Sequence, residues 1–393
     1  MAALEGIRIL DMTQYEAGPA CTQALAWMGA DVVKVERPET GDPGRGRAEL
    51  DDEYFLMWNS NKRSITIALE KPEGRELLLK MLPHYDVFVE NYGPGVIEKL
   101  DIDYDVMKKI HPGIIYARVK GFGSSGPYAD YKCFDMVAQA AAGAFSITGE
   151  ADGTPMRPGP TTGDAGTGVQ LALAITAAYI QRMRTGEGQL IELSMQEAMT
   201  YYLRTSIAAS FGGQEVSPRS GTGMGPIINL YPCSPGGSND YVFIMAVTPR
   251  MWQALCTVMW RDDLLTDPRF VSAQLRMDNM KLLAVEIAAW TSRYDKHAAM
   301  KLLADGGVPA SAVFDSVDLF KDRHLNERGF IHEVEHEAHG QIRLLGWPAQ
   351  LSDSKVEISA ASLLGKHTDE VIAADLDLSA SEIADLRSQG LFG

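Results

Sequence analysis

Residues 6–36 decide the fold, and they read GIRILDMTQYEAGPACTQALAWMGADVVKVE. A mostly apolar run at 7–11 and a second one at 31–36 flank a stretch that has helical character up to Met28 and Gly29. Two short strands joined by a helix of this length are typical of a βαβ unit, in which the strands are parallel. We therefore expect a parallel sheet to begin at this point of the chain.

The same alternation continues through the first half of the chain. Further strands are predicted at 64–69, 86–90, 113–119 and 190–195, and helices at 71–82, 104–110 and 169–184. Strands that alternate with helices predict the α/β fold class with a parallel sheet. Ligands of such sheets bind at the carboxyl ends of the strands. The segments after Asp11, Glu36, Glu90 and Lys120 are therefore where we expect chemistry.

The second half of the chain has a different character. Residues 212–226 contain five glycines and two prolines, which is typical of a linker or a mobile loop. A hairpin around residues 235–237 opens a smaller α/β unit that extends to about Val313. Residues 329–351 are then predicted to form paired strands, and residues 379–386 a closing helix.

Composition and charge exclude several classes of protein. The 393 residues carry a net charge of −16, and nucleic acids and anionic membranes are polyanions, so neither is expected as a partner. The four cysteines, at 21, 133, 233 and 256, form no CxxC pair, which favours a reducing compartment. No targeting or membrane-spanning segment is apparent, and we therefore expect a cytoplasmic protein.

Short motifs that would indicate other enzymes lack the expected context. The string HEVEH at 332–336 matches the HExxH of zinc peptidases, which requires a helix. Alternating residues and a His-Gly turn at 339–340 predict a surface hairpin here instead, with no metal site. The glycine-rich stretch at 221–226 precedes an apolar run and not a helix, so a dinucleotide site is not expected. Serine-hydrolase chemistry has no GxSxG anchor.

Asp164 lies in the glycine-rich stretch 158–168, just before the helix predicted at 169–184. Aspartate is a favoured helix N-cap, and that role alone would explain its position. Two features favour a catalytic role for Asp164. Nearby glycines leave space for a large ligand. The helix N-terminus also stabilises negative charge, both on Asp164 and on an oxyanion that forms beside it. The ordinary aspartate pKa of about 3.9 predicts a nucleophile that is ionised near neutral pH.

Basic residues gather near the predicted strand ends. They are Arg37, the pair Lys62-Arg63, Lys99 and Lys132. Each of them alone is most simply a solvated surface charge. Several cations at the ligand edge of one sheet, in a chain with a net charge of −16, predict a phosphorylated ligand.

Ordered motifs along the chain resemble those of the family III CoA transferases. This group includes formyl-CoA:oxalate CoA-transferase, carnitine CoA-transferase and the methylacyl-CoA racemases. The similarity runs nearly end to end, and it rests on GIRILD at 6–11, AGPACTQ at 17–23, GADVVKVE at 29–36, NKRS at 61–64, ENYGPG at 90–95, DPRF at 267–270, GVPA at 307–310 and GKHTDE at 365–370.

The resemblance implies a set of site residues. Asp164 matches the aspartate nucleophile, and Gln14, Glu16 and Gly163 are expected to position the substrate. The residues that match the CoA-contacting positions are Arg37, Asn91, Tyr92, Lys99, Lys132 and Phe134. No permanently bound cofactor and no metal are implied, since the coenzyme A thioester is itself the substrate. Glu16 departs from the glutamine of formyl-CoA transferases.

The resemblance also implies an architecture. The fold would combine a Rossmann-like large domain, built from both chain ends, with a small α/β domain in an interlocked-ring homodimer. We accordingly expect the large domain at 1–195 and 330–393, a linker at 196–226, the small domain at 227–313 and a second linker at 314–329.

The implied function is transfer of CoA from an acyl-CoA thioester to a small carboxylic acid, through an aspartyl anhydride and an aspartyl-CoA thioester. A 2-methylacyl-CoA racemase or isomerase on the same scaffold is an alternative. No histidine lies between His111 and His297, which disfavours it, because exchange of an α-proton needs two acid/base groups. A non-catalytic partner subunit is a further alternative, against which the presence of Asp164 speaks.

Overall fold

The computed structural model describes residues 1–46 and 50–393. Its largest feature is a six-stranded sheet in the order β3-β2-β1-β4-β5-β6, and all neighbouring strands are parallel. The strands are β1 (Arg8–Met12), β2 (Asp31–Glu36), β3 (Lys62–Thr66), β4 (Val87–Glu90), β5 (Ile115–Lys120) and β6 (Leu190–Ser194). The predicted α/β class with a Rossmann-like parallel sheet is therefore confirmed.

Both faces of this sheet are buried at its central strands, and β4 is accordingly a nearly continuous apolar run, VFVE. Alternate residues of β1 enter different cores, since Leu10 packs on one face with Val33 and Phe88. Ile9 packs on the other face with Val32 of β2. The period of two along each strand thus supplies two separate hydrophobic layers.

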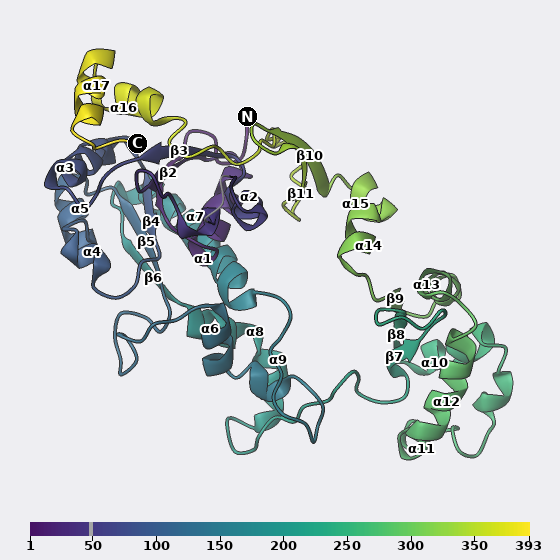
Figure 1. Ribbon diagram of the computed structural model, residues 1–393. Helices are drawn as coiled ribbons and strands as arrows, with labels where there is room; N and C mark the ends of the chain where they lie inside the picture. The colour runs from purple at the N-terminus through teal and green to yellow at the C-terminus, as the bar shows by residue number, and fades with distance from the viewer. Residues whose placement is uncertain (47–49) are drawn as a thin grey trace. The chain divides into compact units, whose positions relative to one another are not determined.

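Helices from distant parts of the chain cover the two faces (Figure 1). One face packs against α1 (Ala17–Ala26) and α7 (Thr167–Thr185). The other packs against α3 (Pro72–Met81), α5 (Tyr104–Ile110), α16 (Thr368–Leu376) and α17 (Ala380–Ser388). The last two helices bring the end of the chain onto a sheet that is built from its first half.

Contacts divide the chain into two compact units. The first comprises residues 1–144, 157–215 and 329–393, and the second comprises 145–156 and 216–328. The second unit has its own core around the antiparallel sheet β7 (Ile228–Pro232), β8 (Tyr241–Met245) and β9 (Ala310–Ala312). Its helices are α10 (Pro249–Val258), α11 (Ala273–Asp278), α12 (Met280–Thr291), α13 (Lys296–Asp305), α14 (Ser316–Lys321) and α15 (Arg323–Glu327). The function of 196–226 and 314–329 as linkers stays a prediction.

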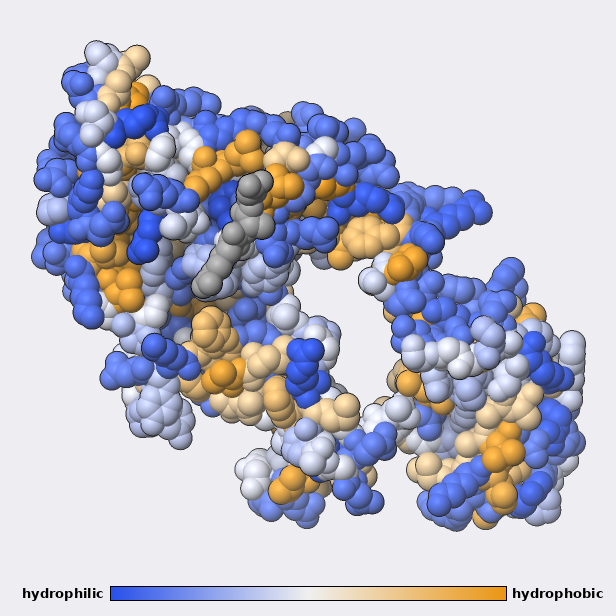
Figure 2. All heavy atoms as spheres, in the orientation of Figure 1, coloured by the Kyte–Doolittle hydropathy of each residue, from blue (hydrophilic) through white to orange (hydrophobic). Residues whose placement is uncertain are grey.

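The remaining helices belong to the first unit. They are α2 (Glu53–Asn59), α4 (Val96–Lys99), α6 (Asp135–Ala142), α8 (Met195–Tyr202) and α9 (Arg204–Ile207). No helix among the described residues has the length and apolar character that crossing a membrane requires. Hydrophilic residues predominate on the face drawn in Figure 2, with smaller apolar patches between them.

The HEVEH string lies on a strand, as the hairpin prediction expected. β10 (Ile331–His336) pairs antiparallel with β11 (Gly340–Leu345). The buried His336 ring accepts hydrogen bonds at Nδ1 from the amides of Ala338 and His339, so this nitrogen closes the turn of the hairpin. The helical arrangement that a zinc peptidase needs is therefore absent from this segment.

Candidate active site

The strand order of the sheet reverses beside β1, because β2 lies on one side of it and β4 on the other. In parallel sheets such a reversal leaves a ligand-binding crevice at the carboxyl ends of the strands. Two cavities lie at this edge, with volumes of about 800 Å³ and about 310 Å³. Gln14, Tyr15 and Tyr92 line both of them, so the two cavities adjoin.

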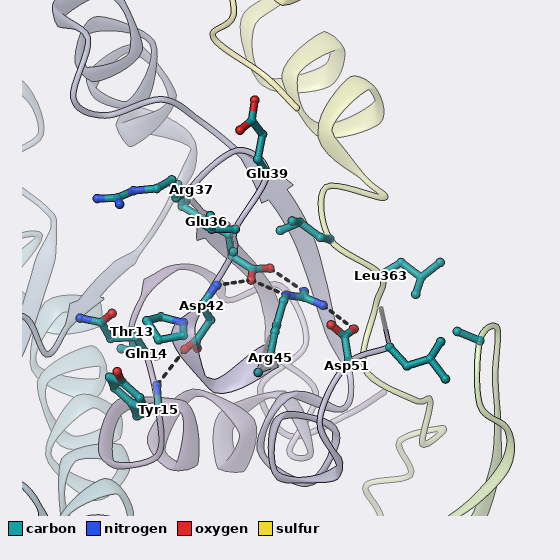
Figure 3. Close-up of a pocket in the computed structure, with 18 of the residues that line it drawn as sticks. Thr13, Gln14, Tyr15, Glu36, Arg37, Glu39, Asp42, Arg45, Asp51 and Leu363 are labelled. Carbon is teal, nitrogen blue, oxygen red and sulfur yellow. Dashed lines mark hydrogen bonds and ion pairs between the residues drawn. The ribbon is translucent and has the colours of Figure 1, made fainter. Parts of the chain in front are cut away.

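Arg45 organises the wall of the larger cavity (Figure 3). Its guanidinium donates two hydrogen bonds of 2.7 Å to the buried carboxylate of Glu36, and a third of 2.6 Å to Asp51. Burial opposes ionisation of Glu36, but these bonds outweigh it and hold the pKa of Glu36 below its ordinary value. A compensated buried ion pair therefore holds Arg45 against the end of β2.

A second set of buried charges lies beneath this loop. Lys34 Nζ is 2.8 Å from Asp42 Oδ2, and Lys62 Nζ is 3.1 Å from Asp11 Oδ2. Asp11 also accepts hydrogen bonds from the Thr22 hydroxyl and the Thr13 amide. The Lys62–Asp11 pair connects β3 to β1, and the Lys34–Asp42 pair connects β2 to the segment that follows it.

The expectation that Lys62 and Arg63 lie at the ligand edge is wrong. β3 starts at Lys62 and not at residue 64, so both residues belong to the amino end of that strand. Lys62 is buried in its pair with Asp11, and Arg63 donates at 2.6 Å to Asp31, where β2 begins. Both cations therefore form ion pairs with aspartates of the same sheet.

Asp164 lies in a short π-helical segment, Thr162–Gly166, directly before α7. Its amide donates to Asp135 Oδ1 and to the Thr161 carbonyl, both at 3.1 Å. The N-cap interpretation is wrong, because Gly166 precedes α7 and no side chain caps this helix. In the part of the chain that the structure describes, the Asp164 carboxylate accepts no hydrogen bond, and it lines the smaller cavity.

Gly163 is required by the close approach of this segment to α6. A Cβ at this position would lie 2.7 Å from Asp135 Oδ1 and 2.9 Å from the Asp135 carbonyl oxygen. Asp135 is itself held by the Gln139 side-chain amide, at 2.8 and 3.0 Å. The glycine therefore sets the position of Asp164, although it does not line the smaller cavity.

The electrostatics of Asp164 differ from the sequence-based expectation. Burial, followed by the negative charges of Glu16 and Asp135, raises the pKa of Asp164 to about 8. Glu16, only 3% exposed, lines the same cavity and accepts a hydrogen bond from the Thr161 hydroxyl. The expectation of an ordinary aspartate pKa is wrong, because the fold places like charges around a desolvated carboxyl group.

Asn91 and Tyr92 follow β4, where Asn91 lines the smaller cavity and Tyr92 lines both. The Asn91 side chain accepts from the Gln14 amide at 2.9 Å and donates to the Gln14 carbonyl at 2.8 Å. Its amide group therefore fixes the loop after β1. Lys120 Nζ lies 3.0 Å from Glu90 Oε1 and donates to the Tyr92 carbonyl at 2.8 Å, which joins the ends of β4 and β5.

The other predicted contact residues divide among several places. Arg37 is exposed and lines the larger cavity. Lys132 and Phe134 line the smaller one, and the Phe134 ring packs edge-on against Tyr15 with 6.0 Å between the ring centres. Lys99 is an exposed residue of α4 and is not among the described residues that line either cavity.

Sequence reasoning missed Tyr15, Thr161 and Asp135 as parts of the site. Tyr15 has a left-handed backbone with a φ of 62°, and it lines both cavities. Thr161 meets Glu16 across 145 positions of sequence. A signal existed only for Asp135, since an acid in the first turn of a helix is easily recognised.

Comparisons with known proteins point in one direction. The family described as CoA-transferase family III matches residues 4–368 of the chain. A formyl-CoA:oxalate CoA-transferase of Streptomyces coelicolor is 38% identical, with 99% of each chain covered, and one of a Bradyrhizobium species is 36% identical, with 99% and 97% covered. A CAIB/BAIF family protein from Brucella suis has a crystal structure that matches with a TM-score of 0.87 and 30% identity, over 95% of this chain and 99% of that one.

Proposed function

Because this chain belongs to CoA-transferase family III, we propose that it transfers coenzyme A from an acyl-CoA thioester to a small carboxylic acid, with Asp164 as the nucleophile. One observation carries the assignment of Asp164. Its carboxylate lines the smaller cavity at the carboxyl edge of the sheet and accepts no hydrogen bond from the described residues. A carboxylate that is desolvated and unpaired is a stronger nucleophile than one in an ion pair.

The reaction begins when an Asp164 carboxylate oxygen attacks the carbonyl carbon of the donor thioester. The carbon–sulfur bond breaks, and the products are a mixed anhydride and the CoA thiolate. The thiolate then attacks Asp164 Cγ, the donor acid leaves as a carboxylate, and an aspartyl-CoA thioester remains. This first half consumes no proton and needs no metal or redox group.

The second half runs the same steps toward the acceptor. The acceptor carboxylate attacks Asp164 Cγ and displaces the thiolate, which gives a new anhydride. The thiolate attacks the acyl carbon on the acceptor side of this anhydride. The new acyl-CoA forms, and Asp164 returns as a carboxylate. Each anhydride step is reversible, because the group that leaves the anhydride is a carboxylate that can attack again. Exchange of CoA between two acids requires this reversibility.

Ionisation of Asp164 limits this chemistry. With a pKa raised to about 8, roughly a tenth of the carboxyl groups are ionised at pH 7. The proton leaves to water through the open cavity before acyl-CoA is attacked. The Asp164 carboxylate is thus reactive when it is ionised, but only a minor fraction of the molecules carries it in that form at pH 7.

The adjoining cavities support a placement of CoA across the carboxyl ends of the strands. The nucleotide end lies in the larger cavity, where Arg37 is available to a phosphate. The pantetheine arm passes Tyr92, which lines both cavities, and the thioester reaches Asp164 beside Lys132 and Phe134. Asn91 acts on this path through its hydrogen bonds to Gln14. Lys99 contributes only as a peripheral cation in this arrangement.

The same proposal includes an interlocked homodimer, in which residues 212–226 and 313–322 let one chain pass through the other. Light scattering of the purified chain tests it, and a monomer at working concentration contradicts it. Glycines at 212, 213 and 221 with positive φ values support the tight turns that such a crossing needs.

The decisive experiment for Asp164 compares two variants and a control. Asp164→Ala and Asp164→Asn should abolish CoA transfer while acyl-CoA still binds, and exposed Asp152→Asn should leave transfer unchanged. Hydroxylamine added with acyl-CoA should modify Asp164 alone, as read by peptide mass spectrometry. Substantial transfer by Asp164→Ala, or a label on Glu16 or Asp135, contradicts the mechanism. Exchange of the substrate α-proton without CoA transfer would favour the isomerase alternative.

A further inference from the structure

The smaller cavity, which Asp164 lines, has several apolar side chains in its wall. They come from four different elements and loops, and they are Ala17, Val119, Ala129, Phe134 and Met195. Aliphatic and aromatic groups at a reaction centre favour a ligand with an apolar body, because burial of such a body releases it from water. In the proposed reaction, the acyl group that Asp164 attacks would enter this cavity.

Three carboxyl groups are concentrated at the same place, and burial raises the pKa of Glu16 as it raises that of Asp164. Glu16 lines the cavity beside Asp164, and Asp135 lies behind it, with its carboxylate on the Asp164 amide at 3.1 Å. The groups that hold these carboxylates are neutral donors, namely the Thr161 hydroxyl on Glu16 and the Gln139 amide on Asp135. Neither Glu16, Asp135 nor Asp164 forms an ion pair with any residue that the structure describes.

The cations of this cavity do not offset that charge. Lys120 lines the cavity, but its ammonium group is 3.0 Å from Glu90 Oε1 and is buried there. Lys132 is exposed, where solvent and salt screen its charge. A second carboxylate on an acid bound at Asp164 would therefore enter a partly desolvated region of like charge, where exposed Lys132 is the one unpaired cation among the described lining residues.

We propose that the acids between which CoA is exchanged are monocarboxylates with an apolar body, and that buried Glu16 is the residue that excludes acids with a second carboxylate. This inference rests on the proposed CoA transfer through Asp164 and adds the substrate class. It separates the chain from its relatives that are named for oxalate, the smallest dicarboxylate. Glu16 acts by charge, since its position at the start of α1 is fixed by the fold.

The test measures kcat/KM for CoA transfer to a panel of acceptors. Propanoate, 2-methylpropanoate and benzoate represent the monocarboxylates, and oxalate and succinate the dicarboxylates. We expect the unaltered protein to favour the best monocarboxylate over oxalate at least tenfold. Glu16→Gln keeps the shape of the side chain and removes its charge, so the preference should fall at least tenfold, mainly through a lower KM for oxalate. Exposed Glu187→Gln is the matched control and should leave the preference unchanged.

The outcomes separate this inference from the function on which it rests. Oxalate as the best acceptor, or a preference that Glu16→Gln does not change, overturns the role of Glu16. If the variant does not fold, the unaltered protein is tested with two acyl-CoA donors instead. Oxalyl-CoA should acylate Asp164 at least tenfold more slowly than 2-methylpropanoyl-CoA. Equal acylation by both donors overturns the inference but leaves the nucleophile in place. Absence of any label on Asp164 overturns the proposed function itself.

Discussion

The charge of Glu16 should control the pH at which the enzyme becomes active. In the proposed mechanism only ionised Asp164 attacks a thioester. The value of kcat/KM for acyl-CoA should therefore rise with pH and reach half of its plateau near pH 8, where Asp164 has its raised pKa. Below that value the rate should fall about tenfold for each pH unit, because the ionised fraction does. A site with an ordinary aspartate would instead be fully active from about pH 5 upward.

The perturbation is Glu16→Gln, which removes the larger of the two charge effects on Asp164 and leaves burial and Asp135 in place. Two charges in one partly desolvated cavity repel by an energy on the order of 1–3 kcal/mol at an effective dielectric constant near 20. This energy corresponds to an increase of roughly 5- to 150-fold in the ionised fraction well below pH 8. The rate at pH 6 should therefore rise strongly, while the plateau above pH 9 stays nearly unchanged.

The assay follows initial rates with saturating monocarboxylate acceptor between pH 5.5 and 9.5. Single-turnover acylation of Asp164, read by rapid quench and peptide mass spectrometry, isolates the chemical step from product release. Glu187→Gln should reproduce the profile of the unaltered protein. A profile that is flat across this range, or a midpoint that Glu16→Gln leaves in place, would refute the electrostatic reasoning.

Three other perturbations test separate parts of the site. Asp164→Asn should raise the melting temperature more at pH 9 than at pH 5. Because the pKa of Asp164 is raised in the folded state, the contribution of Asp164 to stability is fully present below its unfolded pKa and is lost as the pH rises through about 8. Calorimetry of both proteins at the two pH values measures this difference. Gly163→Ala should lower kcat at least tenfold with little change in KM for acyl-CoA, because its Cβ meets Asp135 at 2.7 Å; steady-state kinetics with unchanged kcat would contradict this. Arg45→Met should lower the free energy of unfolding by about 3–5 kcal/mol, because it leaves the buried Glu36 carboxylate without its partner. Urea unfolding measures this change, and a loss below about 1 kcal/mol would argue against the ion pair.

Local pattern predicted most of the secondary structure of the first unit, although β3 begins at Lys62 and not at residue 64. The helix predicted at 104–110 is α5 with the same bounds, and the strand predicted at 31–36 is β2. The hairpin prediction for 329–351 was also correct, because alternation and a glycine turn are properties of adjacent residues. The parallel sheet also predicts that ligands bind at the carboxyl ends of its strands, and this place of chemistry stays a prediction.

Tertiary contacts decided the chemical state of the side chains at that edge. Lys62 looked like a ligand-binding cation, but its partner Asp11 lies 51 positions earlier, and the pair is buried. Asp164 has the sequence position of an ordinary N-cap aspartate. Its pKa is raised by burial first, and then by the charges of Glu16, 148 positions away, and of Asp135. Secondary structure depends on spacing within a few residues, whereas a pKa depends on burial and on charges that only the folded chain brings together.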